Sequence, residues 1–442
     1  MRIVYFLILY YPIHEMALKG IGFRGDFLFL ARQWPDLLFL ISFIFVALMR
    51  FERIESVSIR SGISIWMMLF VIYSVLLSAS IGANNNAIAF SEIFILLRFT
   101  ALYGFIVILS PSTTQIHFSI SLILLSSMFQ FIVGLMQFAG GEEVFQFFKP
   151  LDYNSVFSNI ERSFTSNREG DRQMIIGSVG DFISFAYVIA IGMFIAIASD
   201  ISRVKRVTVF FAFFALLFYS GSRTVFLGSF FSILYFYILT NSIDKKVISI
   251  IVVATVGIIG FVVMGSLSES VEYRYSSFLA IFSPQIIENL LNQRLGTLIY
   301  ITPNYILSGD FLIGMSPDRF YLAEYVEQRY VGVPWILNAV LTNVVEDFYL
   351  LTLFLYYGLT GFLLLLVIFI VLWRMCWKVY RYFDRFVGAL GILMLLGAGV
   401  FNIANQALEV RMFAVFFWMI MGFNCVILRE KRKSVANTFS AQ

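Results

Sequence analysis

The sequence predicts an all-α, polytopic membrane helix bundle, and two observations lead to this prediction. Of the 442 residues, 60% are hydrophobic and only 13% are charged, which is more apolar surface than a water-soluble core of this size buries. The apolar residues also fall in blocks of roughly 17–25 residues, the length that a helix needs to cross about 30 Å of hydrocarbon. The whole chain, 1–442, is therefore expected to form one transmembrane domain with about twelve spanning helices.

The predicted spans follow one another from the first residues to the last. The first block is expected to be a short spanning helix rather than a cleavable signal. His14 and Glu15 follow its apolar run, where small residues would mark a cleavage site. The blocks, in chain order, are 3–18, 34–49, 62–81, 90–110, 116–138, 182–199, 205–219, 224–240, 247–264, 348–372, 386–406 and 411–428.

The short connections set the predicted orientation, because lysine and arginine are enriched on the cytoplasmic side of a membrane. Among the short connections on the opposite side, only Arg223 is basic. Both termini are therefore predicted to be cytoplasmic. The basic residues gather in the connections 50–61, 200–206, 241–246 and 373–385 and in the tail after Leu428.

Two long segments fall on the outer side, at 139–181 and 265–347. Loops of this length usually carry function or are poorly ordered. The second one is expected to contain an amphipathic helix near 284–299, which begins after Ser283 and carries Arg294 on its apolar face. An arginine there needs a carboxylate, a lipid phosphate or a substrate phosphate. An ion pair or a lipid contact explains Arg294 as well as a substrate does.

A short turn with the sequence SGSRT, at 220–224, is a candidate anion site. A serine in such a turn can cap the next helix and leave backbone N–H groups facing outward. Arg223 would lie in the first turn of that helix, where the macrodipole disfavours a cation. We therefore interpret Ser222 and Arg223 as groups that bind an anion. The alternative is that Arg223 reaches the phosphate of a neighbouring lipid.

Two adjacent carboxylates, Glu346 and Asp347, precede the predicted span 348–372. A carboxylate in a partly apolar site can have a raised pKa and act as a general base. Helix capping is the alternative, because the dipole of the helix favours acidic residues at its N-terminus. Glu409 and Arg411, further along the chain, are interpreted as residues of a turn.

Four short segments occur in a characteristic order across residues 90–430. The arrangement resembles the O-antigen polymerase and ligase superfamily of bacterial envelopes, which comprises Wzy-type polymerases and their ligase relatives. Ligase relatives carry a histidine where this chain has Glu346, which favours a polymerase. The last segment is similar to the family's His-Asn-x-Tyr…Gly-Leu-x-Gly pattern. The segments are 174–181 (MIIGSVGD), 220–223 (SGSR), Arg294 with Gly309 and 313–315 (IGM), and 346–349 (EDFY) running to 357–361 (YGLTG).

The resemblance implies a fold like that of the lipid-sugar-dependent GT-C glycosyltransferases, and chemistry that needs no metal and no cofactor. It implies an enzyme of the bacterial cytoplasmic (inner) membrane that acts at the outer leaflet. The implied partners are a polyprenyl-pyrophosphate-linked oligosaccharide, membrane lipid and a chain-length regulator protein, with no nucleic acid. Arginines can replace a metal ion at a departing pyrophosphate. The implied pyrophosphate-binding residues are Arg223 and Arg294, with Arg172, Arg274 and Ser222 behind them, and the implied catalytic residues are Glu346 and then Asp347.

Two other functions stay open at this point. A ligase would transfer finished glycan to a lipid acceptor, and a transporter would move polysaccharide or lipid across the membrane. Transporters often show internal repeats and polar residues near the membrane midplane. The sequence shows no such repeat, and its arginines concentrate in the outer loops.

Overall fold

The computed structural model confirms the all-α class for the part of the chain that it describes, where every regular element is helical. The predicted span 247–264, the predicted amphipathic helix 284–299 and most of both outer loops lie outside that part. The described residues are 1–21, 26–49, 62–81, 93–94, 96, 99–148, 175–220, 222–240, 303, 305–317, 349–404 and 407–440.

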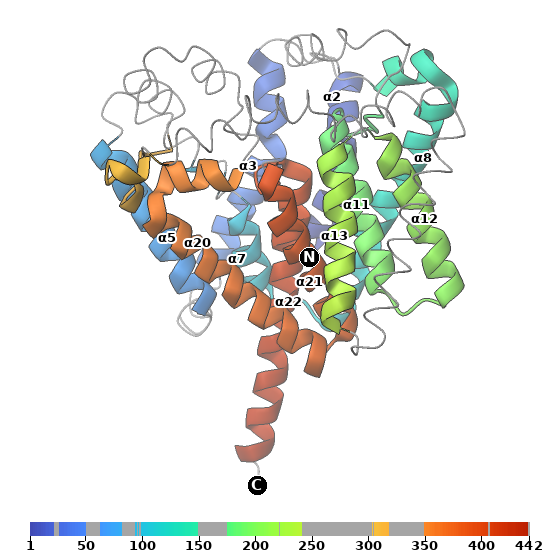
Figure 1. Cartoon of the computed structure of the whole chain (residues 1–442). Helices are drawn as coiled ribbons and strands as arrows, with labels where there is room; N and C mark the ends of the chain where they lie inside the picture. The colour runs from blue at the N-terminus through green and yellow to red at the C-terminus, as the bar shows by residue number, and fades with distance from the viewer. Residues whose placement is uncertain are drawn as a thin grey trace, which may run out of the picture.

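The helices form one bundle, and Figure 1 shows them side by side. In chain order they are α1 (Arg2–Tyr10), η1 (Tyr11–Ile13), α2 (His14–Ile21), α3 (Asp26–Met49), α5 (Gly62–Ile81), α7 (Thr100–Leu109), α8 (Thr113–Phe148), α11 (Phe182–Ala198), α12 (Arg203–Tyr219), α13 (Arg223–Thr240), η3 (Asp310–Leu312), α20 (Tyr349–Tyr382), α21 (Arg385–Ala404) and α22 (Arg411–Ser440).

Among the described residues, four helices are long and apolar enough to cross a membrane. These lie in α8, α20, α21 and α22, and five shorter apolar helices accompany them. Several helices extend beyond the predicted apolar blocks: α3 begins at Asp26, α8 continues to Phe148 and α22 to Ser440. Backbone hydrogen bonds continue where the sequence turns polar, so apolar composition marks the stretch suited to lipid rather than the end of the helix.

The bundle has two ends. Those connections between helices that the structure describes lie at the same end when they are predicted to share a side of the membrane (Figure 1). At one end, which we call the tail end, α22 projects from the bundle toward the C-terminus. His117 Nε2 lies 2.7 Å from Asp384 Oδ2 there and joins α8 to the α20–α21 connection. The opposite end, which we call the loop end, holds residues 10–13, 175–181, 220–222 and 407–410.

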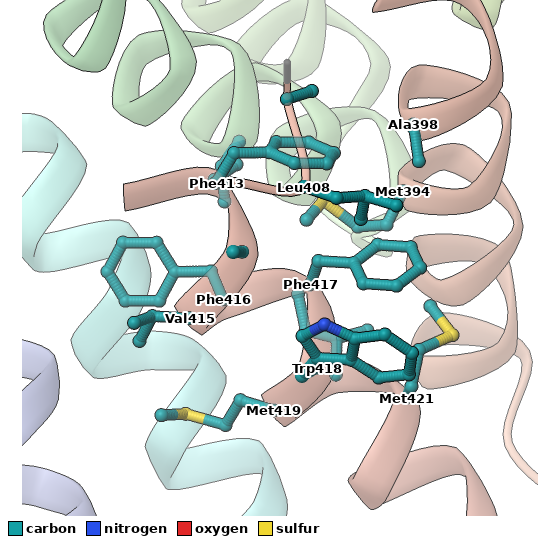
Figure 2. Close-up of a cluster of buried hydrophobic side chains, with 14 of the residues drawn as sticks. Met394, Ala398, Leu408, Phe413, Val415, Phe416, Phe417, Trp418, Met419 and Met421 are labelled. Carbon is teal, nitrogen blue, oxygen red and sulfur yellow. The ribbon is translucent and has the colours of Figure 1, made fainter. Parts of the chain in front are cut away.

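The centre of the bundle is formed by α11, α21 and α22. In the most apolar 18-residue stretch of α22, 89% of the residues are buried inside the bundle, against 39% in that of α20. Aromatic rings and methionines of α22 and α21 interlock there, among them Phe413, Phe417 and Met394 (Figure 2). The peripheral helices instead expose apolar side chains such as Leu48 and Leu76, which suits contact with lipid.

Helix α20 is broken at Gly358, whose backbone angles are φ 61° and ψ −172°. The break frees carbonyl groups that a continuous helix would satisfy internally. The N–H groups of Met315 and Ser316 donate to Leu355 O (3.0 Å) and Tyr356 O (3.1 Å). The hydroxyl of Tyr73, on α5, donates to the carbonyl oxygens of Tyr357 (3.0 Å) and Ile313. The segment 305–317 therefore docks on the break and supplies donors that lipid does not.

Two glycines make this docking geometrically feasible. Gly314 has a φ of +100°, and a Cβ added to it would lie 2.5 Å from both Gly358 N and Tyr356 O. Gly358 meets the backbone of residues 313 and 314 equally closely. The two backbones therefore touch directly, with no room for a side chain between them.

We predict that Gly314→Ala lowers the free energy of unfolding by more than about 3 kcal/mol, because backbone clash adds to the strain of a positive φ. Gly309→Ala is the matched control, since Gly309 also has a positive φ (+83°) but has nothing within 4 Å of an added Cβ. The control should cost about 1–2 kcal/mol. Thermal unfolding of the purified proteins in detergent measures both, and equal midpoint shifts would contradict the prediction.

Candidate functional site at the loop end

A partly buried hydrogen bond joins the start of α20 to the connection between α21 and α22. Tyr349, the first residue of α20, donates from its hydroxyl to Glu409 Oε1 at 2.7 Å. The tyrosine is buried and the glutamate is half-buried. Tyr349 lies two residues after Asp347 in the chain, so the described end of this predicted catalytic segment is anchored at the loop end.

A second charged contact joins η1, α3 and α22. Arg411 Nη2 lies 3.2 Å from Asp36 Oδ2, and the side chains are 18% and 8% exposed. Tyr11 donates from its hydroxyl to Asp36 Oδ1 at 2.6 Å. The Arg411 guanidinium also lies 6.0 Å from the centre of the Tyr11 ring. The carboxylate of Asp36 balances the guanidinium, so we interpret Arg411 as a structural ion-pair residue rather than a phosphate ligand.

Two buried glutamines of α8 hold the segment that ends the first outer loop. Gln137 Oε1 accepts hydrogen bonds from the N–H groups of Ile176 (3.1 Å) and Gly177 (3.0 Å), and its amide donates to Gly177 O (3.1 Å). Gln130 accepts from Ser178 N–H at 2.9 Å and donates to Pro12 O at 3.0 Å. The backbone of 176–178 is therefore fully tied to α8 and η1.

Asp181 closes this segment and starts α11. Its Oδ1 accepts a hydrogen bond from the N–H of Ser184 at 2.7 Å, the geometry of an N-cap. The pKa of the Asp181 carboxyl is raised, mainly because burial disfavours the charged form and to a smaller extent because of the Glu15 carboxylate. The hydrogen bonds from Ser184 and Ile183 oppose this shift. The cap explains why α11 begins at Phe182, where the predicted span 182–199 begins.

The serine-containing turn lies between α12, which ends at Tyr219, and α13, which begins at Arg223. Ser220 and Ser222 are both buried. Ser220 Oγ donates to Leu217 O (2.6 Å) and accepts from the N–H of Ser222 (3.3 Å). The turn is therefore held by its own serines, and the first turn of α13 carries Arg223 as predicted.

The predicted site residues divide into two groups. Ser222 and the backbone of Arg223 belong to the described part of the chain and lie at the loop end. The flanks of two further segments also lie there, at Ile175 and Tyr349. The other predicted site residues lie outside the described residues, namely Arg172, Arg274, Arg294, Glu346 and Asp347.

The charged residues of the loop end were not predicted as a site. Glu409 and Arg411 were interpreted as turn residues, and Asp36 lies unremarked within the predicted span 34–49. An ionisable residue inside an apolar span is a functional or structural signal by default, and this would have drawn attention to Asp36. Comparison with known protein families finds no match, and no curated protein matches the chain.

We predict that Gln137→Met lowers the free energy of unfolding by about 2–4 kcal/mol, because two N–H groups and one carbonyl lose their buried partner. Gln115→Met, at the other end of α8, is the control. Gln115 is exposed and accepts one hydrogen bond, from Ser112 N–H at 3.0 Å, so its loss should cost less than about 1 kcal/mol. Thermal unfolding compares the two variants, and similar losses would contradict the glutamine assignment.

A double-mutant cycle tests the ion pair. Asp36→Asn and Arg411→Met should each destabilise the protein by about 3 kcal/mol, because each leaves a buried charge without its partner. The double variant should lose less than the sum, with a coupling of about 1–3 kcal/mol. Chemical denaturation in detergent measures the four proteins, and strictly additive losses would show that the two charges do not stabilise one another.

Proposed function

We propose that the protein is a polymerase that joins polyprenyl-pyrophosphate-linked oligosaccharide repeat units into O-antigen or a related surface polysaccharide. It acts at the outer leaflet of the bacterial cytoplasmic membrane, as a metal-independent glycosyltransferase. The proposal includes about twelve spans, a GT-C-like fold and both termini in the cytoplasm. The loop end of the bundle is then the outer face.

One observation carries the proposal: three segments that resemble the polymerase family have their described residues at the same end of the bundle. Residues 176–178 are tied to the glutamines of α8. The turn before Arg223 is held by its serines. Tyr349, which closes the EDFY segment, is bonded to Glu409. Segments distant in sequence thus approach one surface, as a shared active site requires.

The proposed reaction is a displacement at the anomeric carbon of the sugar that is linked to pyrophosphate. A hydroxyl oxygen of the incoming lipid-linked unit forms the new glycosidic bond. The bond from the anomeric carbon to the pyrophosphate oxygen breaks, and its electron pair leaves with the pyrophosphate. The hydroxyl proton passes to Glu346, with Asp347 as the second candidate base.

The charge of the departing pyrophosphate needs cationic partners. Arg223 is the leading residue, because it opens α13 directly after Ser222, and the N-terminus of a helix favours an anion. Arg294, Arg172 and Arg274 are the further candidates. Arg411 is not among them, since Asp36 already balances its charge.

We predict that Arg223→Ala and Glu346→Gln each reduce polymer formation by at least about 100-fold, because each removes a group that acts on the transition state. Gel analysis of surface glycan from a complemented deletion strain should then show single capped repeat units. Arg381→Ala is the control, because this tail-end arginine packs over Trp377 at 5.1 Å, away from the proposed site. It should leave the polymer ladder unchanged.

The same gels separate the competing functions when membrane abundance of each variant matches wild type. Normal long-chain polymer from both variants would overturn the proposed site. Lipid-linked polymer that accumulates without transfer would identify a ligase. Repeat units retained on the cytoplasmic side would identify a transporter.

A further inference from the structure

One buried amide at the loop end has an oxygen without a hydrogen-bond partner. Asn402 lies in the last turn of α21, is 2% exposed, and its Oδ1 accepts no hydrogen bond. A buried acceptor without a donor costs free energy that the fold must recover elsewhere, so such a group calls for a specific reason. A ligand that brings its own donor would supply one.

Helical periodicity shows which way Asn402 faces. Figure 2 shows Ala398 and Met394 on the side of α21 that is turned toward Leu408 and Phe413. Asn402 follows Ala398 by four residues, so it lies on the same face, one turn nearer the loop end. That face is turned toward the connection 407–410, which carries Glu409.

The polar groups on this side of the bundle suit a neutral hydroxylated ligand. Asn402 offers an amide, Glu409 a carboxylate, and Tyr349, bonded to Glu409 at 2.7 Å, a phenol hydroxyl. A sugar hydroxyl is both donor and acceptor, and side chains of these kinds bind it from either side. Arg411 on this side already contacts Asp36, and Glu409 is itself an anion, so neither group favours a phosphate.

The position of α13 relates this surface to the proposed pyrophosphate site. A Cβ on Gly228 of α13 would meet the ring of Phe401, the neighbour of Asn402 on α21. Arg223 precedes Gly228 by five residues, or about 8 Å of helix, toward the loop end. The start of α13 and the end of α21 therefore lie side by side. In a lipid-linked oligosaccharide the first sugar and the pyrophosphate are likewise neighbours.

We propose that Asn402, together with Glu409 and Tyr349, forms a subsite that binds sugar hydroxyl groups of the lipid-linked oligosaccharide. This inference rests on the proposed polymerase function and deepens it by separating a neutral sugar subsite from the cationic pyrophosphate site. Because Asn402 Oδ1 accepts no hydrogen bond within the protein, it adds nothing to the stability of the fold, and its proposed role is to bind substrate.

The test is a substitution that should impair binding without impairing the fold. Asn402→Leu replaces the amide with an apolar side chain of the same branching and number of heavy atoms, so the thermal midpoint should stay unchanged or rise. The KM for polyprenyl-pyrophosphate-linked oligosaccharide, measured on full-length protein in nanodiscs, should rise about tenfold, as expected for one lost hydrogen bond to substrate, with kcat within about twofold. Calorimetry with lipid-free repeat-unit oligosaccharide should show the same loss.

Asn424→Leu is the matched control. Asn424 of α22 is also buried with Oδ1 unbonded, but its amide nitrogen donates to Val387 O (3.2 Å) and Ile420 O (3.0 Å). Its replacement should lower the thermal midpoint and leave KM unchanged. An Asn402→Leu protein with a higher midpoint and wild-type KM would overturn the subsite. So would parallel losses of midpoint and affinity like those of a structural residue.

The two assays separate the subsite from the proposed function. Wild-type protein that binds the lipid-free oligosaccharide through Asn402 but never elongates lipid-linked units would overturn the polymerase and retain the subsite. Wild-type protein that elongates these units, with Asn402→Leu indistinguishable from it in both assays, would overturn the subsite and retain the polymerase.

Discussion

Hydrogen bonding of main-chain groups in α20 determines how the loop end is built. A carbonyl group in lipid has no water to bond, so a break in a helix persists only where other segments replace the lost bonds. At Gly358 the replacements come from residues 313–316 and from Tyr73 of α5. One irregular residue thereby joins a late loop segment, a neighbouring helix and α20, the helix that begins at Tyr349, into a single unit.

The same requirement shapes the rest of the loop end. Gln130 and Gln137 satisfy the backbone of 176–178, and Asp36 balances Arg411 inside the bundle. Polar groups are costly in such surroundings unless they are paired, and here they are paired between elements rather than within them. These contacts fix where the described ends of the long loops join the bundle. The transferase proposed above would need such fixed attachment, because its reacting groups come from several loops.

The helices that follow from runs of apolar residues could be predicted from the sequence. The contacts between residues that are distant in the sequence could not. The span 182–199 matches α11 because an apolar run follows a capping aspartate, and Arg223 opens α13 after a serine turn. Nothing in the local sequence relates Asp36 to Arg411, which are 375 residues apart. Gly358 lies in a continuous apolar run, so periodicity gives no sign of the break there. Of the predicted site, Ser222 and the start of α13 are described, whereas the catalytic pair remains a prediction.

The docking of 313–316 on α20 has an evolutionary consequence. Two of its hydrogen bonds join main-chain atoms, which every residue except proline supplies. The remaining requirements fall on a few residues, namely Gly314 and Gly358 for the close approach and Tyr73, Tyr305 and Thr360 for side-chain hydrogen bonds. Residues 318–345, which lie between this joint and the proposed base Glu346, can therefore differ in sequence without changing the residues that make the joint. In the polymerase proposed above, such a joint would allow one recognition loop to replace another on an unchanged set of helices.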